Sequence, residues 1–376
     1  MRPVLKAGLL PVWRDRETVQ IGIDPRRAVA LTGMSHAALV LGLLDGSRDR
    51  DQVIAAARER GIPEPVTDRI LTLLALGGAL DDFPAAAMRA VPQDRRRRLA
   101  AELAAASLAR GHSDAGAAAL VRRDAARVQI YGSGRVAATI ADILGTSGIG
   151  RVATSDRIRA DDRVHPDSAR SVRARRAPRP GAASSASPRA GQPPAPRAGQ
   201  PAAPRAGQPA GRDRPDRDSQ RPLPDLAILI GYQSPELAAS LMAASVPHLA
   251  VAAAEAIGVV GPLVRPGRTA CLRCLDLTRS SLDPAWPLIL AQLVGRTADP
   301  PACDAALAAA VAAQAAAQAL AFIDRIPPGG PAENATLELV LPGWQWRRRT
   351  WPAHASCGCA RPPARRPPAR AERRAD

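Results

Sequence analysis

The hydrophobic pattern of the first 90 residues predicts short strands followed by three helices. Val19, Ile21 and Ile23 alternate with polar or small residues, as in a half-buried strand, and residues 28–31 suggest a second strand. The first helix is expected at residues 36–46. The second is expected to begin after an N-cap at Ser47, and the third to span residues 65–76. This order is typical of a small winged-helix α+β domain, which we assign to residues 1–90.

A different pattern begins at Arg127 and predicts a Rossmann-like α/β domain over residues 127–360. A strand, a glycine turn, a helix and a second strand follow one another up to Asp156. Further strands are expected in LAILIG after Asp225, in PHLAV at 247–251, and as a last pair at 337–340 and 344–348, with an Ala-rich helix at 302–326. Residues 91–126, with helical spacing of Ala and Arg, are expected to connect the two domains as a helix pair.

Two segments lack the pattern of a folded domain. Residues 163–222 contain three near-copies of PRAGQPxA, which predicts a disordered Pro/Arg-rich insert, and residues 361–376 predict a disordered basic tail. The net charge is +17. The segment from Arg157 to Pro222 has a net charge of +9 and the tail one of +4, so these two segments account for 13 of the 17 charges. Because the remainder is nearly balanced, the charge alone does not call for a nucleic-acid partner.

The composition favours a cytoplasmic chain without a membrane segment. Its 376 residues are 46% hydrophobic but only 2% aromatic, so the cores are expected to consist of Val, Leu, Ile and Ala. We expect no membrane span, because no long apolar run without charges or helix breakers stands out, and no signal-peptide pattern at the start. The five Cys are too few for a disulfide framework in a chain of this length.

Four of these cysteines form two close pairs, Cys271 with Cys274 and Cys357 with Cys359. Two short-spaced pairs of thiolates brought together can close a tetrahedral structural zinc site. The alternative is that they are reduced, buried thiols. His354 could replace one ligand but is expected to be only a neighbour, and the fifth cysteine, Cys303, is expected to pack on a helix.

A glycine turn follows the first strand of the α/β domain. Gly132 and Gly134 allow a tight turn in which a phosphate can approach the N-terminus of the next helix, and Ala137 is tolerated at the third position of such a motif. Asp156, at the end of the following strand, has the position of an acid that binds ribose hydroxyls. The turn therefore predicts a nucleotide site, or alternatively the inherited architecture of one.

Together with these motifs, the segment GVVGPLVRPGRTACLRCLDLTRSSLDPAWP at Gly258–Pro287 resembles the ThiF/MoeB superfamily of ubiquitin-activating-like adenylyltransferases. More narrowly, the chain is similar to the actinobacterial leader-peptide-binding, cyclodehydratase-partner branch of azole peptide (bacteriocin) biosynthesis, and residues 1–90 resemble PqqD-like peptide-binding modules. The resemblance implies a zinc site at the four Cys, ATP and magnesium at the glycine turn, a precursor peptide, a YcaO-type partner enzyme and a homodimer.

The sequence departs from the family's catalytic pattern at three points. Residues 157–164 read RIRADDRV instead of the family's Asn-x-x-Arg-Gln segment, and the α/β domain contains no lysine for the phosphates. Gly231-Tyr232-Gln233 stands where the family places a magnesium-binding Asp. Because adenylation needs cations on the phosphates and a metal at the developing charge, these changes argue against catalysis.

We therefore expect a binding protein that captures a precursor peptide and presents it to a YcaO-type enzyme. The peptide is expected to add a strand at the edge near Val19, Ile21 and Ile23. The main alternative is an active adenylyltransferase that activates a peptide or carrier-protein carboxylate with ATP. A nucleic-acid-binding regulator ranks third, because Arg69 is the only basic residue between Thr67 and Leu76. A nicotinamide-dependent dehydrogenase ranks below it.

Overall fold

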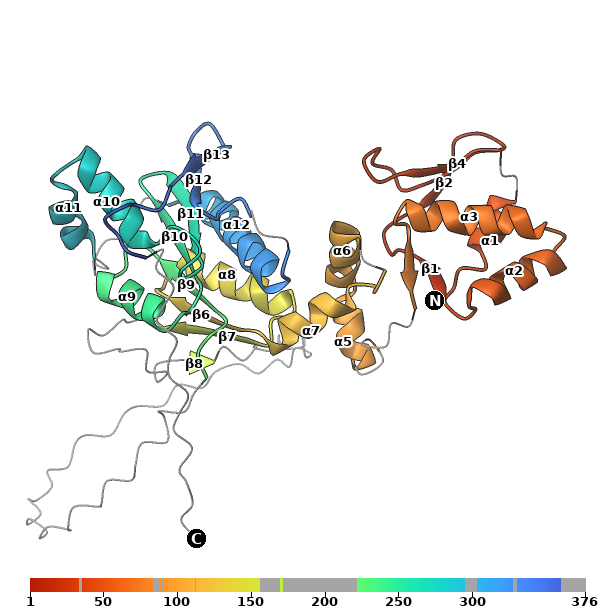
Figure 1. Ribbon diagram of the computed structural model, residues 1–376, viewed down its shortest axis with the longest axis horizontal. Coiled ribbons are helices and arrows are strands. Elements are labelled where there is room, and N and C mark those ends of the chain that lie inside the picture. The colour runs from red at the N-terminus through yellow and green to blue at the C-terminus, as the bar shows by residue number, and fades with distance from the viewer. Residues whose placement is uncertain are drawn as a thin grey trace, which may run out of the picture.

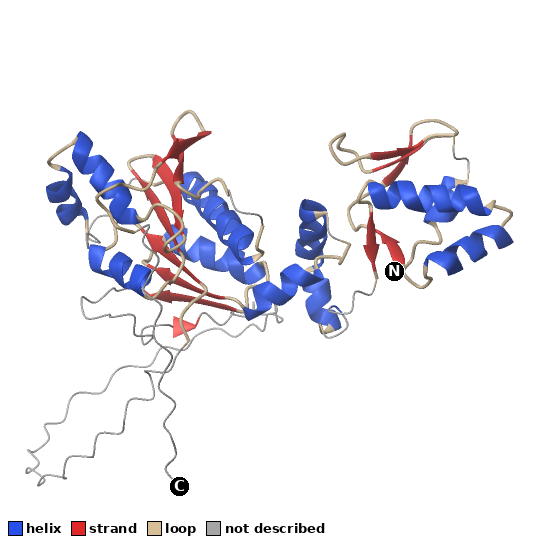
Figure 2. Ribbon diagram, viewed as in Figure 1, coloured by secondary structure: helices blue, strands red, loops and turns tan. Residues whose placement is uncertain are grey.

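The computed structural model describes residues 1–33, 36–83, 88, 91–111, 113–155, 170–171, 222–294, 303–326 and 330–359. These residues form an N-terminal α+β unit, a helical connector and a larger α/β unit (Figures 1 and 2). The expected Pro/Arg-rich insert, apart from 170–171 and 222, and the expected tail lie outside the described residues.

Within its described residues, the N-terminal unit forms two small antiparallel sheets that pack with helices α1, α2 and α3. One sheet has the strand order β2-β3-β4 and the other pairs β1 with β5. The elements are β1 (Pro3–Leu5), β2 (Pro11–Trp13), β3 (Val19–Ile21), β4 (Val29–Leu31), α1 (Ala37–Leu41), α2 (Arg50–Glu59), α3 (Glu64–Leu76) and β5 (Leu80–Asp82). Their core is aliphatic, with Val19, Ile21, Ile70 and Leu74 fully buried.

Two local expectations for this unit need correction. The first helix is much shorter than 36–46, because it ends at Gly42 and the chain then forms a β-bridge between Asp45 and Val4. The second helix is capped by Asp49, not by Ser47: the Asp49 carboxylate accepts the Gln52 N–H, and the Gln52 side chain accepts the Asp49 N–H. Ser47 instead hydrogen-bonds to the Asp45 carboxylate.

The connector consists of three helices instead of two: α5 (Gln93–Arg98), α6 (Ala100–Arg110) and α7 (Ala117–Ala125). On the N-terminal side, the Lys6 ammonium lies 3.2 Å from Asp81 and donates to Ser107 of α6. On the other side, Arg123 of α7 makes a two-nitrogen ion pair with the buried Asp324. Hydrogen bonds of Ser107 with the buried Lys6–Asp81 pair attach the connector to the N-terminal unit, and the Arg123–Asp324 ion pair attaches it to the α/β unit.

The α/β unit is built on a mixed sheet with the strand order β13-β12-β11-β10-β9-β6-β7-β8. Strands β7, β6, β9 and β10 run parallel, and the rest of the ladder is antiparallel. The strands are β6 (Arg127–Tyr131), β7 (Arg151–Ser155), β8 (Arg170–Ser171), β9 (Leu226–Ile230), β10 (His248–Ala254), β11 (Ile257–Val264), β12 (Ala335–Val340) and β13 (Gln345–Thr350). Strand β11, which holds the conspicuous GVVGPLV segment, was not expected as a strand.

Helices cover both faces of this sheet (Figures 1 and 2). On one face, α8 (Arg135–Thr146) and α12 (Ala305–Ile323) bury their aliphatic residues against the sheet. On the other face, α9 (Pro235–Ala243) packs against β9, and α10 (Leu272–Leu282) follows the first cysteine pair and leads to α11 (Trp286–Leu293). The result is a three-layer arrangement, consistent with the expected Rossmann-like domain.

Helix α12 contradicts the expectation that no apolar run is long enough for a membrane. It has 19 residues and a mean hydropathy of 1.8, so by length and composition alone it could cross a membrane. Its small side chains, however, form the inner layer of the sheet core, where Val311, Ala312, Ala315 and Ala316 are fully buried. Burial inside the α/β unit accounts for the apolar composition of this helix.

Candidate functional site

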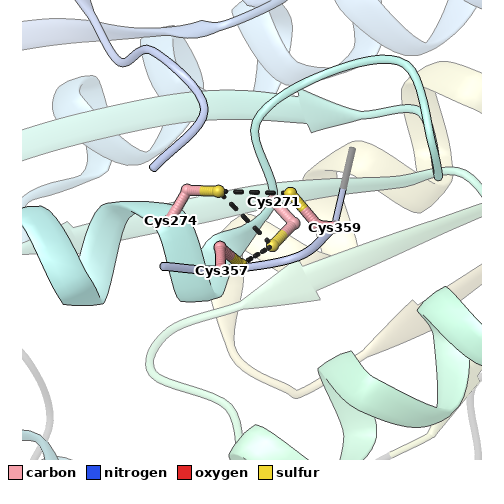
Figure 3. A group of neighbouring side chains, drawn as sticks. All are labelled: Cys271, Cys274, Cys357 and Cys359. Carbon is pink, nitrogen blue, oxygen red and sulfur yellow. Dashed lines mark hydrogen bonds between the residues drawn. The ribbon is translucent and has the colours of Figure 1, made fainter. Parts of the chain in front are cut away.

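The four paired cysteines meet in one cluster. Cys271 immediately precedes α10 and Cys274 lies in its first turn, while Cys357 and Cys359 follow β13 (Figure 3). The four sulfur atoms all lie within 4.8 Å of one another, and the closest pairs are 3.3 and 3.5 Å apart. Sulfurs bound to one zinc at about 2.3 Å are about 3.8 Å apart, so this donor set fits a tetrahedral zinc ion.

Burial is the largest single influence on the pKa of Cys271, Cys274 and Cys359, although hydrogen bonds lower the pKa of Cys274 overall. Burial raises the pKa of the Cys271 thiol, and burial together with the hydrogen bond to Cys274 raises the pKa of Cys359 to about 11. A bound divalent cation deprotonates such thiols outright. His354 is not a ligand: its Nδ1 accepts the Ser356 N–H and its carbonyl accepts the Cys357 N–H, so it shapes the turn.

The fifth cysteine stands apart from this cluster. Cys303 precedes Asp304, the N-cap of α12, and is partly buried against the sheet core. It therefore packs next to a helix, as expected, although outside the helix itself.

A cation–π stack lies next to the cluster. The Arg279 guanidinium of α10 lies 4.7 Å from the ring of Trp286 and 5.4 Å from that of Trp351. Trp351 is buried, and its indole N–H donates to Thr336. The stack fixes α11 and the end of β13 to α10, so it stabilises the segments that carry both cysteine pairs.

Both glycines of the turn after β6 have positive φ. Gly132 has φ of +112°, and a Cβ there would lie 2.9 Å from the Cβ of Ile230. Gly134, with φ of +92°, is the N-cap of α8, and a Cβ there would meet open space. Ala137 is buried where α8 packs on the sheet. Gly132 and Gly134 therefore form a tight turn before α8 that other residues would strain, and Asp156 lies outside the described residues.

The groups around this turn differ from those of a working adenylation site. Gln233 has its side-chain amide donating to the Ile230 carbonyl, so it is used to close the turn after β9. The only lysine in the sequence, Lys6, is buried in the N-terminal unit against Asp81. Arg135, exposed at the first position of α8, is the cation nearest in sequence to the glycines. It is therefore the candidate phosphate contact in place of a lysine.

The expected peptide edge is not formed by Val19, Ile21 and Ile23. Strand β3 is central, because it pairs with β2 on one side and with β4 on the other. Val19 and Ile21 are fully buried in the core, and Ile23 lies beyond the strand with 72% of its surface exposed. Alternation of apolar residues tells which face of a strand is buried but not which strands flank it.

The open edges of this sheet are β2 and β4, and their backbone groups differ. Gly22 donates to the Leu10 carbonyl and Arg14 to the Thr18 carbonyl. The alternation of an antiparallel ladder then directs the peptide groups of Pro11 and Trp13 outward from β2. Proline has no N–H, which blunts that edge. By the same alternation, Ala30 directs its N–H and carbonyl outward from β4. Strand β2 was not predicted from the sequence, and the short segment Pro-Val-Trp at Pro11–Trp13 was the signal for it.

Comparison by sequence finds no matching family model and no matching curated protein. Among solved structures, the chain is similar to Escherichia coli MccB with ATP, with a TM-score of 0.57, 14% identity, and 96% of this chain and 100% of MccB covered. It is also similar to the heterocyclase TruD, with a TM-score of 0.55 and 16% identity, covering 96% of this chain but 42% of TruD. A heterocyclase with substrate and cofactor matches with a TM-score of 0.57.

These likenesses identify the fold. The chain has the fold of MccB, a ThiF/MoeB-like adenylyltransferase, which agrees with the resemblance of its sequence motifs. The structural neighbours with this fold include MccB, an enzyme of microcin C7 biosynthesis, and the heterocyclase TruD. At 13–16% identity the likeness concerns the fold and leaves the activity of this chain to be proposed.

Proposed function

We propose that the chain binds a precursor peptide and presents it to a YcaO-type cyclodehydratase in the biosynthesis of azole-modified ribosomal peptides. The observation that carries this proposal is the likeness over 96% of the chain both to MccB, solved with N-formylated MccA, and to the heterocyclase TruD. The match includes the N-terminal unit, which we take as the winged-helix-like, PqqD-type peptide-binding module at residues 1–90. The expected compartment is the cytoplasm, where zinc-binding thiols stay reduced.

The peptide is proposed to add as a strand to the edge of β4. Ala30 is exposed and directs one N–H and one carbonyl outward, whereas the β2 edge contains Pro11. Helix α3 packs beside β4: a Cβ on Gly77 would lie 2.3 Å from the Val29 side chain. Leu73 is half-buried there and Leu76 is 80% exposed, so an added strand would find apolar side chains on α3.

The test replaces the outward-facing residue of each edge with proline. Ala30→Pro removes the N–H that the peptide would use, and an edge strand tolerates the proline ring. Trp13→Pro is the matched control at the β2 edge. The ligand is a labelled synthetic peptide from a short Cys/Ser/Thr-rich reading frame beside a YcaO-like gene, and fluorescence anisotropy measures its affinity. We expect Ala30→Pro to weaken binding at least tenfold and Trp13→Pro to leave it unchanged; the reverse result would move the site to β2.

An alanine at Ile21 is not a useful test of this site. Ile21 is fully buried on the central strand, so truncation costs about 2–5 kcal/mol of core packing. A loss of binding by this variant would therefore report unfolding of the unit.

The second candidate function is ATP-dependent activation of a peptide or carrier-protein carboxylate. The open approach at Gly134, beside the exposed Arg135, favours a surviving nucleotide site. Calorimetric titration of the zinc-loaded chain with ATP and magnesium tests it. Micromolar binding followed by magnesium-dependent pyrophosphate release would support an active adenylyltransferase. If no heat is measured up to millimolar ATP, the glycine turn has only a structural role.

The four cysteines are proposed to hold one structural zinc, since a closed set of four thiolates leaves no open position for substrate. In this role the ion fixes the segment with Cys357 and Cys359, after β13, to the start of α10. A homodimer, implied by the family resemblance, completes the proposal and is measured by light scattering of the zinc-loaded chain.

A further inference from the structure

Strand β13 forms one edge of the large sheet (Figure 1). Among the residues that the structure describes, it pairs with β12 alone, and all six of its side chains are exposed. The register with β12 runs without a bulge from Ala335 opposite Thr350 to Val340 opposite Gln345. The strand has neither the proline nor the bulge by which many exposed edges prevent pairing.

The backbone groups on the outer side of β13 follow from its ladder. The Trp351 N–H donates to the Asn334 carbonyl at 2.7 Å, in the same register as the strand pair. The peptide groups of the odd-numbered positions then face β12, and those of Trp346, Arg348 and Thr350 face outward. This edge offers N–H and carbonyl groups at three positions, compared with one residue, Ala30, within β4.

Three consecutive arginines give this edge its charge. Arg347 and Arg349 lie on one face of the strand and Arg348 on the other. Arg348 is held by the carbonyls of Pro331 and Glu333, and Arg349 lies 4.3 Å from the centre of the Trp351 ring. Within the part of the chain that the structure describes, no carboxylate forms an ion pair with Arg347 or Arg349.

This charge pattern selects among the possible occupants of the edge. A second copy of β13 in antiparallel pairing would place arginines opposite arginines, which is destabilising. The sequence of the chain's own insert has a surplus of nine positive charges, and that of its tail a surplus of four, so neither complements the strand. An acidic strand does complement it, because acidic side chains two residues apart would face Arg347 and Arg349.

We propose that the outer edge of β13 docks an extended acidic segment of a second protein. Main-chain hydrogen bonds at Trp346, Arg348 and Thr350 would supply affinity, and carboxylates opposite Arg347 and Arg349 would supply selection. This docking strand is separate from the β4 edge proposed for the precursor peptide, so either proposal can fail without the other.

The test measures binding of a labelled acetyl-(Glu-Val)4-amide peptide to the full-length, zinc-loaded chain by fluorescence anisotropy at low salt. We expect micromolar affinity, and no binding of the matched (Lys-Val)4 peptide. The pair Arg347→Glu and Arg349→Glu should weaken binding at least tenfold, and Trp346→Pro should do the same by removing an outward N–H. Hydrogen exchange should show protection of the Trp346, Arg348 and Thr350 amides in the complex.

Controls separate docking from general attraction to a basic chain. Arg58→Glu in the last turn of α2, together with Arg60→Glu at its C-cap, makes the same change of charge at two exposed residues and should leave binding unchanged. An equal loss of binding in this control, or protection outside β13, would overturn the proposal. Loss of binding only in Ala30→Pro would assign the acidic peptide to the β4 edge. If the wild-type chain does not bind the acidic peptide, the proposal is wrong, and the arginines would serve to prevent pairing between copies of this strand.

Discussion

Lys6→Met should destabilise the buried cluster in which Lys6 and Asp81 of the N-terminal unit bind Ser107 of α6. The Lys6 and Asp81 side chains are only 1% and 4% exposed, and the ammonium donates to Ser107 at 2.7 Å. Methionine has nearly the same length and shape as the lysine stem. The substitution therefore removes the charge with little loss of packing and leaves the Asp81 carboxylate buried beside Ser107 alone.

The cost follows from the orphaned carboxylate. Breaking a buried pair by removing one partner destabilises a protein by about 3–5 kcal/mol, while replacing both partners is often neutral. Because Ser107 still donates to Asp81, at 2.8 Å, we expect the lower end, about 3 kcal/mol. With a urea m-value of about 1–1.5 kcal/mol per molar for a small unit, the midpoint should fall by about 2–3 M.

Urea unfolding monitored by circular dichroism measures this change, with Lys6→Met/Asp81→Asn as the matched control. The control removes both charges and keeps an acceptor for Ser107, so most of the lost stability should return. Two results would refute the reasoning: an unchanged midpoint in Lys6→Met, or a double variant as unstable as the single one. The second result would mean that Lys6 stabilises by packing and not by its charge.

Three further changes have defined outcomes. Cys274→Ser should lower bound zinc from one ion per chain to nearly none, measured by mass spectrometry of the dialysed protein, because the site loses one of four donors. His248→Leu should flatten the loss of stability below pH 6.5: burial lowers the pKa of His248 from 6.5, so its stabilising neutral form is lost as pH falls. Gly132→Ala should destabilise by about 1–3 kcal/mol in thermal unfolding, because φ is +112° and Ile230 occupies the space.

Each of these changes has a control. Cys303→Ser should keep zinc, because Cys303 is outside the cluster; equal zinc in both cysteine variants would contradict the site. The pH slope due to His248 can reach at most about 1.4 kcal/mol per pH unit for one proton, and an unchanged slope in the leucine variant would assign it to other groups. Gly145→Ala, inside α8 with open space around it, should stabilise by about 0.5–1 kcal/mol.

The sequence predicts well those features that depend on neighbouring residues. The turn at Gly132 and Gly134 needs glycine for its backbone angles, and the structure has positive φ at both. The helix at 64–76 was found within one residue, because its apolar spacing continues until Gly77. Two short-spaced cysteine pairs indicated one cluster, since thiols in close pairs are best explained by a shared cation.

The features that sequence could not give depend on partners far along the chain. Val19 and Ile21 were correctly placed in a strand, but only the pairing with β2 and β4 shows that this strand is central. Strand β2 has three residues and begins with proline, too short for a period of two to be recognised. The helix expected at 36–46 ends at Leu41, and Asp45 forms a β-bridge with Val4, a residue 41 positions earlier in the chain.

The cysteine cluster also changes the topology of the chain. Cys271 and Cys357 are 86 positions apart, so a metal held by the four sulfurs would close a ring that contains α10, α11, α12, β12 and β13. By the chain-entropy relation for cross-links, closing a ring of this size removes about 4–5 kcal/mol of freedom from the unfolded state. A single proteolytic cut between Cys274 and Cys357 would then leave two fragments joined through the ion, and adding a chelator would remove this link.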